Sequence, residues 1–242
     1  MNMYSPEEML ENINRVREQI RDAAKEAGRD EKEITLIGVS KFFPAEYAEQ
    51  AFSLGLTDLG ENRPEEMHAK KLAMDEKELH PNWHLIGTIQ SRKVRTIVGD
   101  PYLIHSVDTL SLAKEISKRY QAKDLTARIL LEVNVSGEES KHGFSEEEVK
   151  ARFEELLGLP NLDLCGLMTM APIQQQEGQA RFVFEKTRVL FDQLKKEGAD
   201  EKNWKYLSMG MSGDFREAIA CGATHVRIGT AIFGKRDYPD PV

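Results

Sequence analysis

A lysine at the end of an apolar, β-branched run is the first residue here whose type and place could do chemistry. The run reads ITLIGVSKFFP from Ile34 to Pro44, and the lysine is Lys41. A lysine beside apolar packing loses hydration, which costs free energy unless it is paired or neutral. It could simply extend its ammonium group into water at a strand end. Alternatively, partial desolvation could keep it a reactive amine at the mouth of a barrel.

Two glycine-containing segments near the C-terminus could bind a phosphate group. Ser212 and Gly213 lie in LSMGMSGDF, and Gly229 and Thr230 lie in RIGT. Glycine lets the backbone approach an anion closely, and hydroxyl groups add hydrogen-bond donors. The same glycines could serve only as tight turns. A strand-end lysine beside a phosphate site fits either a Schiff-base aldolase of sugar phosphates or a lysine that holds pyridoxal phosphate.

Alternating strands and helices must position these groups. Apolar runs that predict strands occupy residues 34–42, 58–63, 82–89, 102–108, 127–135, 162–171, 205–212 and 225–234. Amphipathic patterns that predict helices occupy 45–55, 64–78, 91–100, 109–123, 145–159, 177–198 and 214–222. This alternation predicts a (β/α)8 TIM barrel, with its active site at the carboxyl ends of the strands. A doubly wound open sheet is the alternative.

An additional helix is expected before the first strand. Ser5 is a typical N-cap, and Met9, Ile13, Val16 and Ile20 follow at helical spacing. We expect this helix to span residues 5–29. No low-complexity linker divides the chain, so residues 1–242 are expected to form one domain.

Charge and composition argue against several classes of function. The formal net charge is −8, which argues against nucleic-acid binding. We interpret the basic segment SRKVR at 91–95 as the solvated start of a helix. Cys165 and Cys221 lie far apart and predict reduced thiols in a cytoplasmic protein. No apolar run reaches transmembrane length, and the N-terminus does not resemble a signal peptide.

Three other features are weighed and set aside. His80 and His84 are four residues apart, but Pro81 interrupts any helix between them, so no metal site is expected. GTAIFGK at 229–235 resembles a phosphate loop but is followed by Arg236, and its apolar interior reads as a strand. The charged residues 138–141 form either a lid or a plain solvated loop.

Eight motifs follow one another along the chain: GVSKFFP, DLGENR, WHLIGTIQSRK, HSVD, LEVNVSGEESKHGF, GLMTMAP, LSMGMSGDF and HVRIGTAIFG. Together they resemble the pyridoxal phosphate homeostasis protein family, which is of the alanine racemase N-terminal barrel type. The resemblance covers nearly the whole chain after the first helix. Arg92, in QSRK, departs from the asparagine or similar residue expected there, at the rim of the barrel.

The resemblance implies a role for each candidate residue. Lys41 would form a Schiff base with the aldehyde of pyridoxal phosphate, and Asn62 would reach the phenolic oxygen of the ring. Arg227 would donate to the pyridine nitrogen and, because arginine stays protonated, would leave the ring a weak electron sink. The phosphate would be held by Ser212, Gly213, Gly229 and Thr230.

The resemblance also implies a function. The protein would carry or buffer pyridoxal phosphate in intracellular homeostasis, without strong catalysis, and would hand it to apo-enzymes. A racemase of low activity is the alternative. Racemisation needs two bases on opposite faces of the cofactor, and the sequence ends at Val242 without the further β-domain tied to the second base. We expect a cytoplasmic monomer that binds neither nucleic acid nor membrane.

Overall fold

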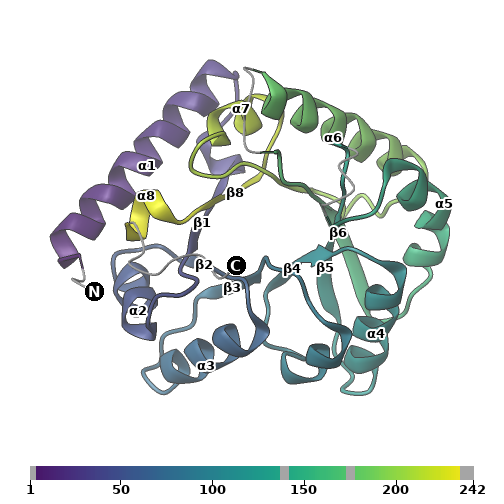
Figure 1. Ribbon diagram of the computed structural model, residues 1–242, viewed down its shortest axis with the longest axis horizontal. Coiled ribbons are helices and arrows are strands. Elements are labelled where there is room, and N and C mark those ends of the chain that lie inside the picture. The colour runs from purple at the N-terminus through teal and green to yellow at the C-terminus, as the bar shows by residue number, and fades with distance from the viewer. Residues whose placement is uncertain (1–3, 137–141, 173–177, 235–242) are drawn as a thin grey trace.

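The strands of this protein close into a parallel barrel (Figure 1). The computed structural model describes residues 4–136, 142–172 and 178–234. The strands are β1 (Thr35–Val39), β2 (Asp58–Glu61), β3 (Asn82–Leu85), β4 (Leu103–Val107), β5 (Ala127–Glu132), β6 (Leu162–Met168), β7 (Tyr206–Ser208) and β8 (His225–Ile228). The last strand pairs with the first, with Thr35 opposite His225. The barrel prediction is therefore confirmed, and the open sheet is excluded.

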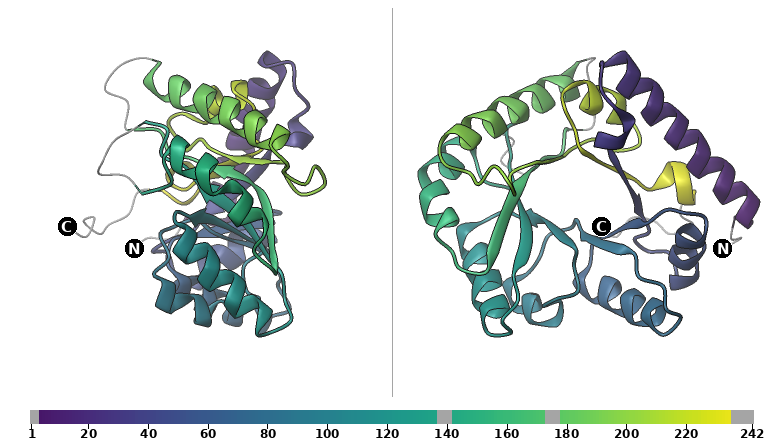
Figure 2. Two further views of the ribbon diagram at one scale, coloured as in Figure 1. Left: turned by 90° about the vertical axis from the view of Figure 1, so that its right-hand side faces the viewer. Right: turned by 180° about the vertical axis from the view of Figure 1, so that it is seen from behind.

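Helices surround the strands on the outside, as three views show (Figures 1 and 2). The α-helices are α1 (Pro6–Glu26), α2 (Ala45–Ser53), α3 (Pro64–Asp75), α4 (Leu110–Gln121), α5 (Glu146–Leu157), α6 (Gln179–Lys196), α7 (Phe215–Ala220) and α8 (Thr230–Phe233). Two 3₁₀-helices, η1 (Glu31–Glu33) and η2 (Ser91–Thr96), complete the set for the described ranges. Because every pair of neighbouring strands is parallel, the carboxyl ends of all the strands lie at one end of the barrel.

The predicted N-terminal helix is present as α1. Ser5 caps it through a capping box with Glu8, which satisfies backbone donors that would otherwise lack partners. Its apolar residues face inward, and α1 contacts α7 and α8. The helix thus covers the seam where β8 meets β1.

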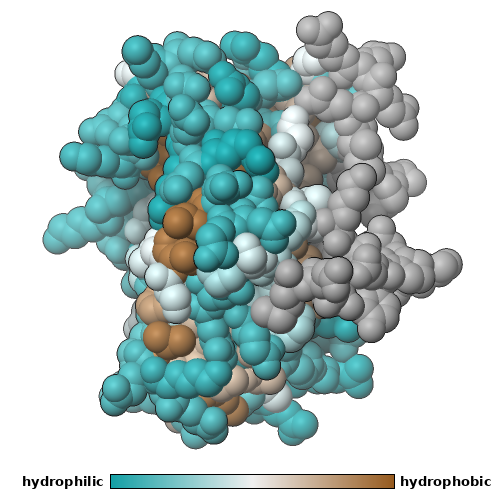
Figure 3. Space-filling view, turned by 90° about the vertical axis from the view of Figure 1, so that its left-hand side faces the viewer, coloured by the Kyte–Doolittle hydropathy of each residue, from teal (hydrophilic) through white to brown (hydrophobic). Residues whose placement is uncertain are grey.

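The face of the molecule drawn in Figure 3 is mostly hydrophilic, with only small hydrophobic spots. No described helix is long and apolar enough to cross a membrane.

One predicted strand is wrong in type over its last part. The strand predicted over 225–234 ends at Ile228, and Thr230–Phe233 form the helical turn α8. A short apolar run fits a buried helix as well as a strand, and here Ile232 and Phe233 are buried while Asn12 of α1 donates to the Ile232 carbonyl (3.3 Å). Within the segment 91–100, which was predicted to be helical, Ser91–Thr96 form the 3₁₀-helix η2.

The turn between β1 and α2 is anchored by α3. The ammonium group of Lys70, which is 5% exposed, donates to the Ser40 carbonyl (2.8 Å), to Glu61 Oε1 (2.6 Å) and to Glu66 Oε1 (3.0 Å). Glu66 also accepts from the backbone N–H of Phe42 (2.7 Å), a residue in the left-handed region at φ 68°. A non-glycine residue adopts this conformation only when its surroundings hold it there. Buried charges on α3 therefore fix the turn that carries the candidate lysine.

Glu61 gives this anchor a pH dependence. Burial, with a smaller contribution from the charge of Glu66, raises the pKa of Glu61 to about 7, although Lys70 and the Ser40 hydroxyl lower it. A carboxyl group whose pKa is higher in the folded state binds more protons folded than unfolded. Its contribution to stability is therefore present at low pH and is lost as the pH rises toward about 7.

Replacing Lys70 by Met tests this anchor. The variant leaves the Glu61 carboxylate buried without its cation, so we expect the free energy of unfolding near pH 8 to fall by about 3–5 kcal/mol. Near pH 6 the loss should be smaller, because the carboxyl can take up a proton instead. Urea unfolding at both pH values measures the difference. Lys71→Met is the control, since the Lys71 ammonium pairs with Asp75 at the half-exposed surface. Equal losses at the two pH values would contradict this account.

Candidate functional site

A cavity of about 390 Å³ opens at the carboxyl ends of the strands. It gathers residues from the ends of most strands, as the barrel rule predicts. Its lining is Val39, Lys41, Asn62, Ile86, Gly87, Thr88, Glu132, Met170, Met211, Ser212, Gly213, Arg227, Gly229 and Thr230. All seven residues singled out from the sequence thus lie on one cavity, although they come from four separate parts of the chain.

Lys41 lies in the turn after β1 rather than at the end of the strand, since β1 stops at Val39. Its side chain is partly buried, and its Nζ atom lies 5.9 Å from the centre of the Phe42 ring. The Arg63 guanidinium lies 5.2 Å from the same ring. The amine is therefore at the edge of apolar packing and has access to the cavity, which agrees with its position after the apolar run ITLIGV.

Arg227 is a cation at the floor of the cavity. It is 5% exposed and donates to Ser208 Oγ (2.6 Å) and to the Thr169 carbonyl (3.0 Å). Burial lowers the pKa of Arg227 to about 10, and the charges of Asp214 and Glu132 oppose this shift. The guanidinium therefore stays protonated at neutral pH and can only donate hydrogen bonds to a ligand.

Glu132 is a site residue that the sequence reasoning missed. It ends β5, is 3% exposed and lines the cavity. Burial and the nearby charge of Asp108 raise the pKa of Glu132 to about 7, while Arg227 lowers it. A carboxyl group with this pKa can hold or give up a proton near neutral pH. The signal was a glutamate ending the apolar run ARILLE, the same kind of signal as a lysine after ITLIGV.

The loops after β7 and β8 form one wall. Gly210, at φ 96°, allows the chain to turn sharply after β7, and a Cβ atom there would lie 2.7 Å from Ala218. The Met211 N–H then donates to Asp214 Oδ1 (2.6 Å). The backbone N–H groups of Ser212 and Gly213 donate to no other group among the described residues, and added atoms at Gly213 would meet only open space. This wall can therefore offer donors to an anion.

Asn62 and Gly87 contact each other closely on the opposite wall. A Cβ atom at Gly87 would lie 2.4 Å from the Asn62 carbonyl oxygen, so only glycine fits beside this asparagine. Met170 and Met211, which are 40% and 39% exposed, complete the rim.

The two histidines set aside in the sequence analysis lie in different environments. His80 lies at the surface against Asp75 (3.0 Å), whereas His84 is buried in the barrel, so the pair does not share a site. No group of three or more metal-ligating side chains occurs in the part of the chain that the structure describes. The loop 138–141 and residues 235 and 236 lie outside the described residues.

The groups that line the cavity fit a ligand with four properties. An amine at Lys41 suits a carbonyl carbon, a permanent donor at Arg227 suits a neutral acceptor atom, and the hydroxyl and N–H groups of the loops suit an anion. The apolar side chains of Val39 and Ile86 line the same cavity and suit a flat ring. A phosphorylated heteroaromatic aldehyde meets all of these requirements.

Comparison with known sequences points to the same chemistry. The family model described as alanine racemase, N-terminal domain, matches residues 7–237. The pyridoxal phosphate homeostasis protein of Aquifex aeolicus is 43% identical over 228 residues, which cover 94% of this chain and 98% of that protein. The protein of the same name from Pseudomonas aeruginosa is 42% identical over 233 residues, covering 96% and 98%.

Solved structures agree with these relatives. PipY of Synechococcus elongatus, solved with pyridoxal phosphate bound, is 30% identical with a TM-score of 0.77, covering 89% of this chain and 100% of that one. An alanine racemase of Clostridium difficile, 18% identical with a TM-score of 0.72, covers 97% of this chain and 58% of that one, and shows the fold alone. Nearly full-length relatives at this level of identity, on this barrel, mean that the chain belongs to the pyridoxal phosphate homeostasis protein family.

Proposed function

We propose that this protein binds pyridoxal phosphate through a Schiff base on Lys41 and carries or buffers it, without strong catalysis. The observation that carries the proposal is the meeting of the Lys41 amine, the Arg227 cation and the donors of the loops after β7 and β8 on one cavity. The names of its relatives and the pyridoxal phosphate bound in PipY support it.

Lys41 makes the covalent attachment. Its neutral amine would bond to the aldehyde carbon of the cofactor, the carbonyl oxygen would leave as water with the two amine protons, and addition of water would reverse the attachment. When bound, pyridoxal phosphate supplies an electrophilic carbon and an electron-withdrawing ring. The attachment is reversible, which is what a protein that stores and releases a cofactor requires.

The other residues hold and tune the ligand. Arg227 donates to the pyridine nitrogen, and because its pKa stays near 10 it keeps that nitrogen unprotonated. An unprotonated ring withdraws electrons weakly, which disfavours racemase chemistry. Asn62 donates to the phenolic oxygen without adding charge. The phosphate is held by Ser212, Gly213, Gly229 and Thr230.

The homologous proteins are named for homeostasis rather than for a reaction. Consistent with that, we propose that PLP-dependent apo-enzymes receive the cofactor from this protein. We further propose a monomer in the cytoplasm, and the free thiols of Cys165 and Cys221 agree with a reducing compartment.

Replacing Lys41 by Ala tests the attachment. Wild-type protein incubated with pyridoxal phosphate should be yellow, lose the colour with borohydride, and gain one phosphopyridoxyl group on the peptide that contains Lys41. Lys41→Ala should stay unlabelled there, while Lys205→Ala, at an exposed lysine, should behave as wild type. Visible spectra and peptide mass spectrometry make the measurement. A label that persists at another lysine in Lys41→Ala would contradict the assignment.

Two rates distinguish a carrier from an enzyme: the rate at which the protein releases the cofactor to an apo-enzyme, and the rate at which it converts amino acids. We expect loaded protein to restore activity to a PLP-dependent apo-enzyme, at a rate equal to its own release of pyridoxal phosphate into buffer. Turnover of amino acids by the loaded protein should stay far below about 1 s⁻¹, the lower end of common enzyme rates. Coupled assays of the apo-enzyme and chiral chromatography of amino acids measure the two quantities. Sustained racemisation in the enzyme range would favour the racemase alternative.

A further inference from the structure

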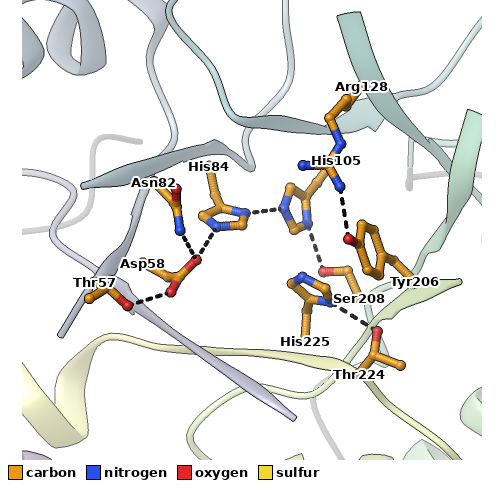
Figure 4. Close-up of polar contacts among 10 residues, drawn as sticks. All are labelled: Thr57, Asp58, Asn82, His84, His105, Arg128, Tyr206, Ser208, Thr224 and His225. Carbon is orange, nitrogen blue, oxygen red and sulfur yellow. Dashed lines mark hydrogen bonds and ion pairs between the residues drawn. The ribbon is translucent and has the colours of Figure 1, made fainter. Parts of the chain in front are cut away.

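A line of hydrogen bonds runs from Arg227 through the inside of the barrel, and Figure 4 shows its part from Ser208 through His105 and His84 to Asp58. It joins side chains of five strands, β2, β3, β4, β7 and β8. From the cavity inward, the contacts are Arg227 Nη1 to Ser208 Oγ (2.6 Å), Ser208 Oγ to His105 Nδ1 (2.8 Å), His105 Nε2 to His84 Nδ1 (2.9 Å) and His84 Nε2 to Asp58 Oδ1 (3.1 Å). We call these five residues the barrel relay.

The middle of the barrel relay is fully buried. Ser208, His84 and His105 are 0% exposed. Polar groups this deep cost free energy unless each is hydrogen-bonded, and here each of the three makes a contact on both sides. The relay ends at Asp58, whose side chain is 15% exposed and which also lines a second cavity at the opposite end of the barrel.

The charges at the two ends fix the direction of every hydrogen bond. Burial disfavours the charge on Asp58, but hydrogen bonds from His84, Thr57 and Asn82 outweigh it and lower its pKa. Burial lowers the pKa of His84 and that of His105, so both rings are neutral. A neutral imidazole has one donor and one acceptor nitrogen.

The proton positions follow one after another. The Asp58 carboxylate can only accept, so His84 carries its proton on Nε2 and its Nδ1 accepts. His105 must then donate from Nε2, and its Nδ1 accepts from the hydroxyl of Ser208. Ser208 Oγ is left to accept from Arg227, which can only donate. All four hydrogen bonds therefore point the same way, from the cation at the cavity to the anion at the far end.

We propose that Asp58, His84, His105 and Ser208 are positioning residues, which hold the Arg227 guanidinium in one orientation toward the cavity by a single fixed arrangement of protons. The consequence for pyridoxal phosphate rests on the proposed function, whereas the arrangement of protons does not. Other charged or titratable groups that face the relay are Arg128, His225, Tyr102, Glu132 and Asp214. None of these is hydrogen-bonded to a relay member among the contacts of the described residues.

The first measurement uses wild-type protein without cofactor. Long-range ¹H–¹⁵N spectra at pH 7, assigned with His84→Gln and His105→Gln, should show both rings neutral, with the proton on Nε2 and a bare Nδ1. Asp58→Ala removes the anionic end and should replace this single form by a mixture of tautomers at both histidines. Asp163→Ala is the control, because Asp163 lies on β6 outside the relay and accepts from Asn203. A charged ring, a proton on Nδ1 in the wild type, or unchanged tautomers in Asp58→Ala would overturn the proposal.

The second measurement follows the cofactor. Ser208→Ala removes one of the two acceptors of Arg227 and leaves the Thr169 carbonyl. The variant should release pyridoxal phosphate about tenfold faster than wild type, as expected for the loss of one hydrogen bond to a charged group, while Lys41 is still labelled after borohydride treatment. Ser117→Ala is the control, since Ser117 is a buried serine whose hydroxyl donates to the Pro160 carbonyl (2.6 Å) away from the relay. Equal release from Ser208→Ala and wild type would overturn the proposal. If wild-type protein does not take up the cofactor, the proposed function fails, and the tautomer measurement decides the inference alone.

Discussion

A guanidinium group buried inside a barrel must find hydrogen-bond acceptors and compensating charge, and the rest of this structure depends on that requirement. Arg227 finds its acceptors on β7 and just after β6, and carboxylates at Glu132 and Asp214 supply negative charge nearby. These partners come from β5, from β7, from the residue after β6 and from the loop before α7, so the closed barrel is what brings them together. Because the cation keeps its proton at neutral pH, the floor of the cavity always presents a donor.

The two principal groups of the cavity are held by different means. Arg227 lies on a strand in the middle of the sheet, whereas Lys41 lies on a turn whose conformation is set by buried charges on α3. A strand gives a fixed position, and a turn gives a side chain room to move. This division suits a ligand that is anchored at its ring and phosphate but attached and detached at its aldehyde.

Much of the fold and of the cavity could be predicted from the sequence, because both follow from local patterns. Lys41, Ser212 and Thr230 were found because polar residues that directly follow apolar strands gather at one end of a parallel barrel, whereas Asn62 and Arg227 were named from the family resemblance. The strand predicted at 225–234 is correct as far as Ile228 and wrong beyond it, because an apolar run does not distinguish a strand from a buried helical turn. The barrel relay gave no local signal: the contact of His105 with Ser208 joins residues 103 positions apart, and only the closed barrel places them together.

The close approach of Gly87 to Asn62 limits which substitutions the protein can accept at position 87. No side chain fits at position 87 while the backbone of Asn62 stays where it is, since even a methyl group would lie 2.4 Å from its carbonyl oxygen. An alteration at 87 must therefore be accompanied by a shift of the β2–α3 connection, which would move Asn62 and the start of α3 together. Helix α3, which begins just after Asn62, holds the turn that carries Lys41. The absence of a side chain at Gly87 therefore affects the positions of both Asn62 and Lys41 in the cavity.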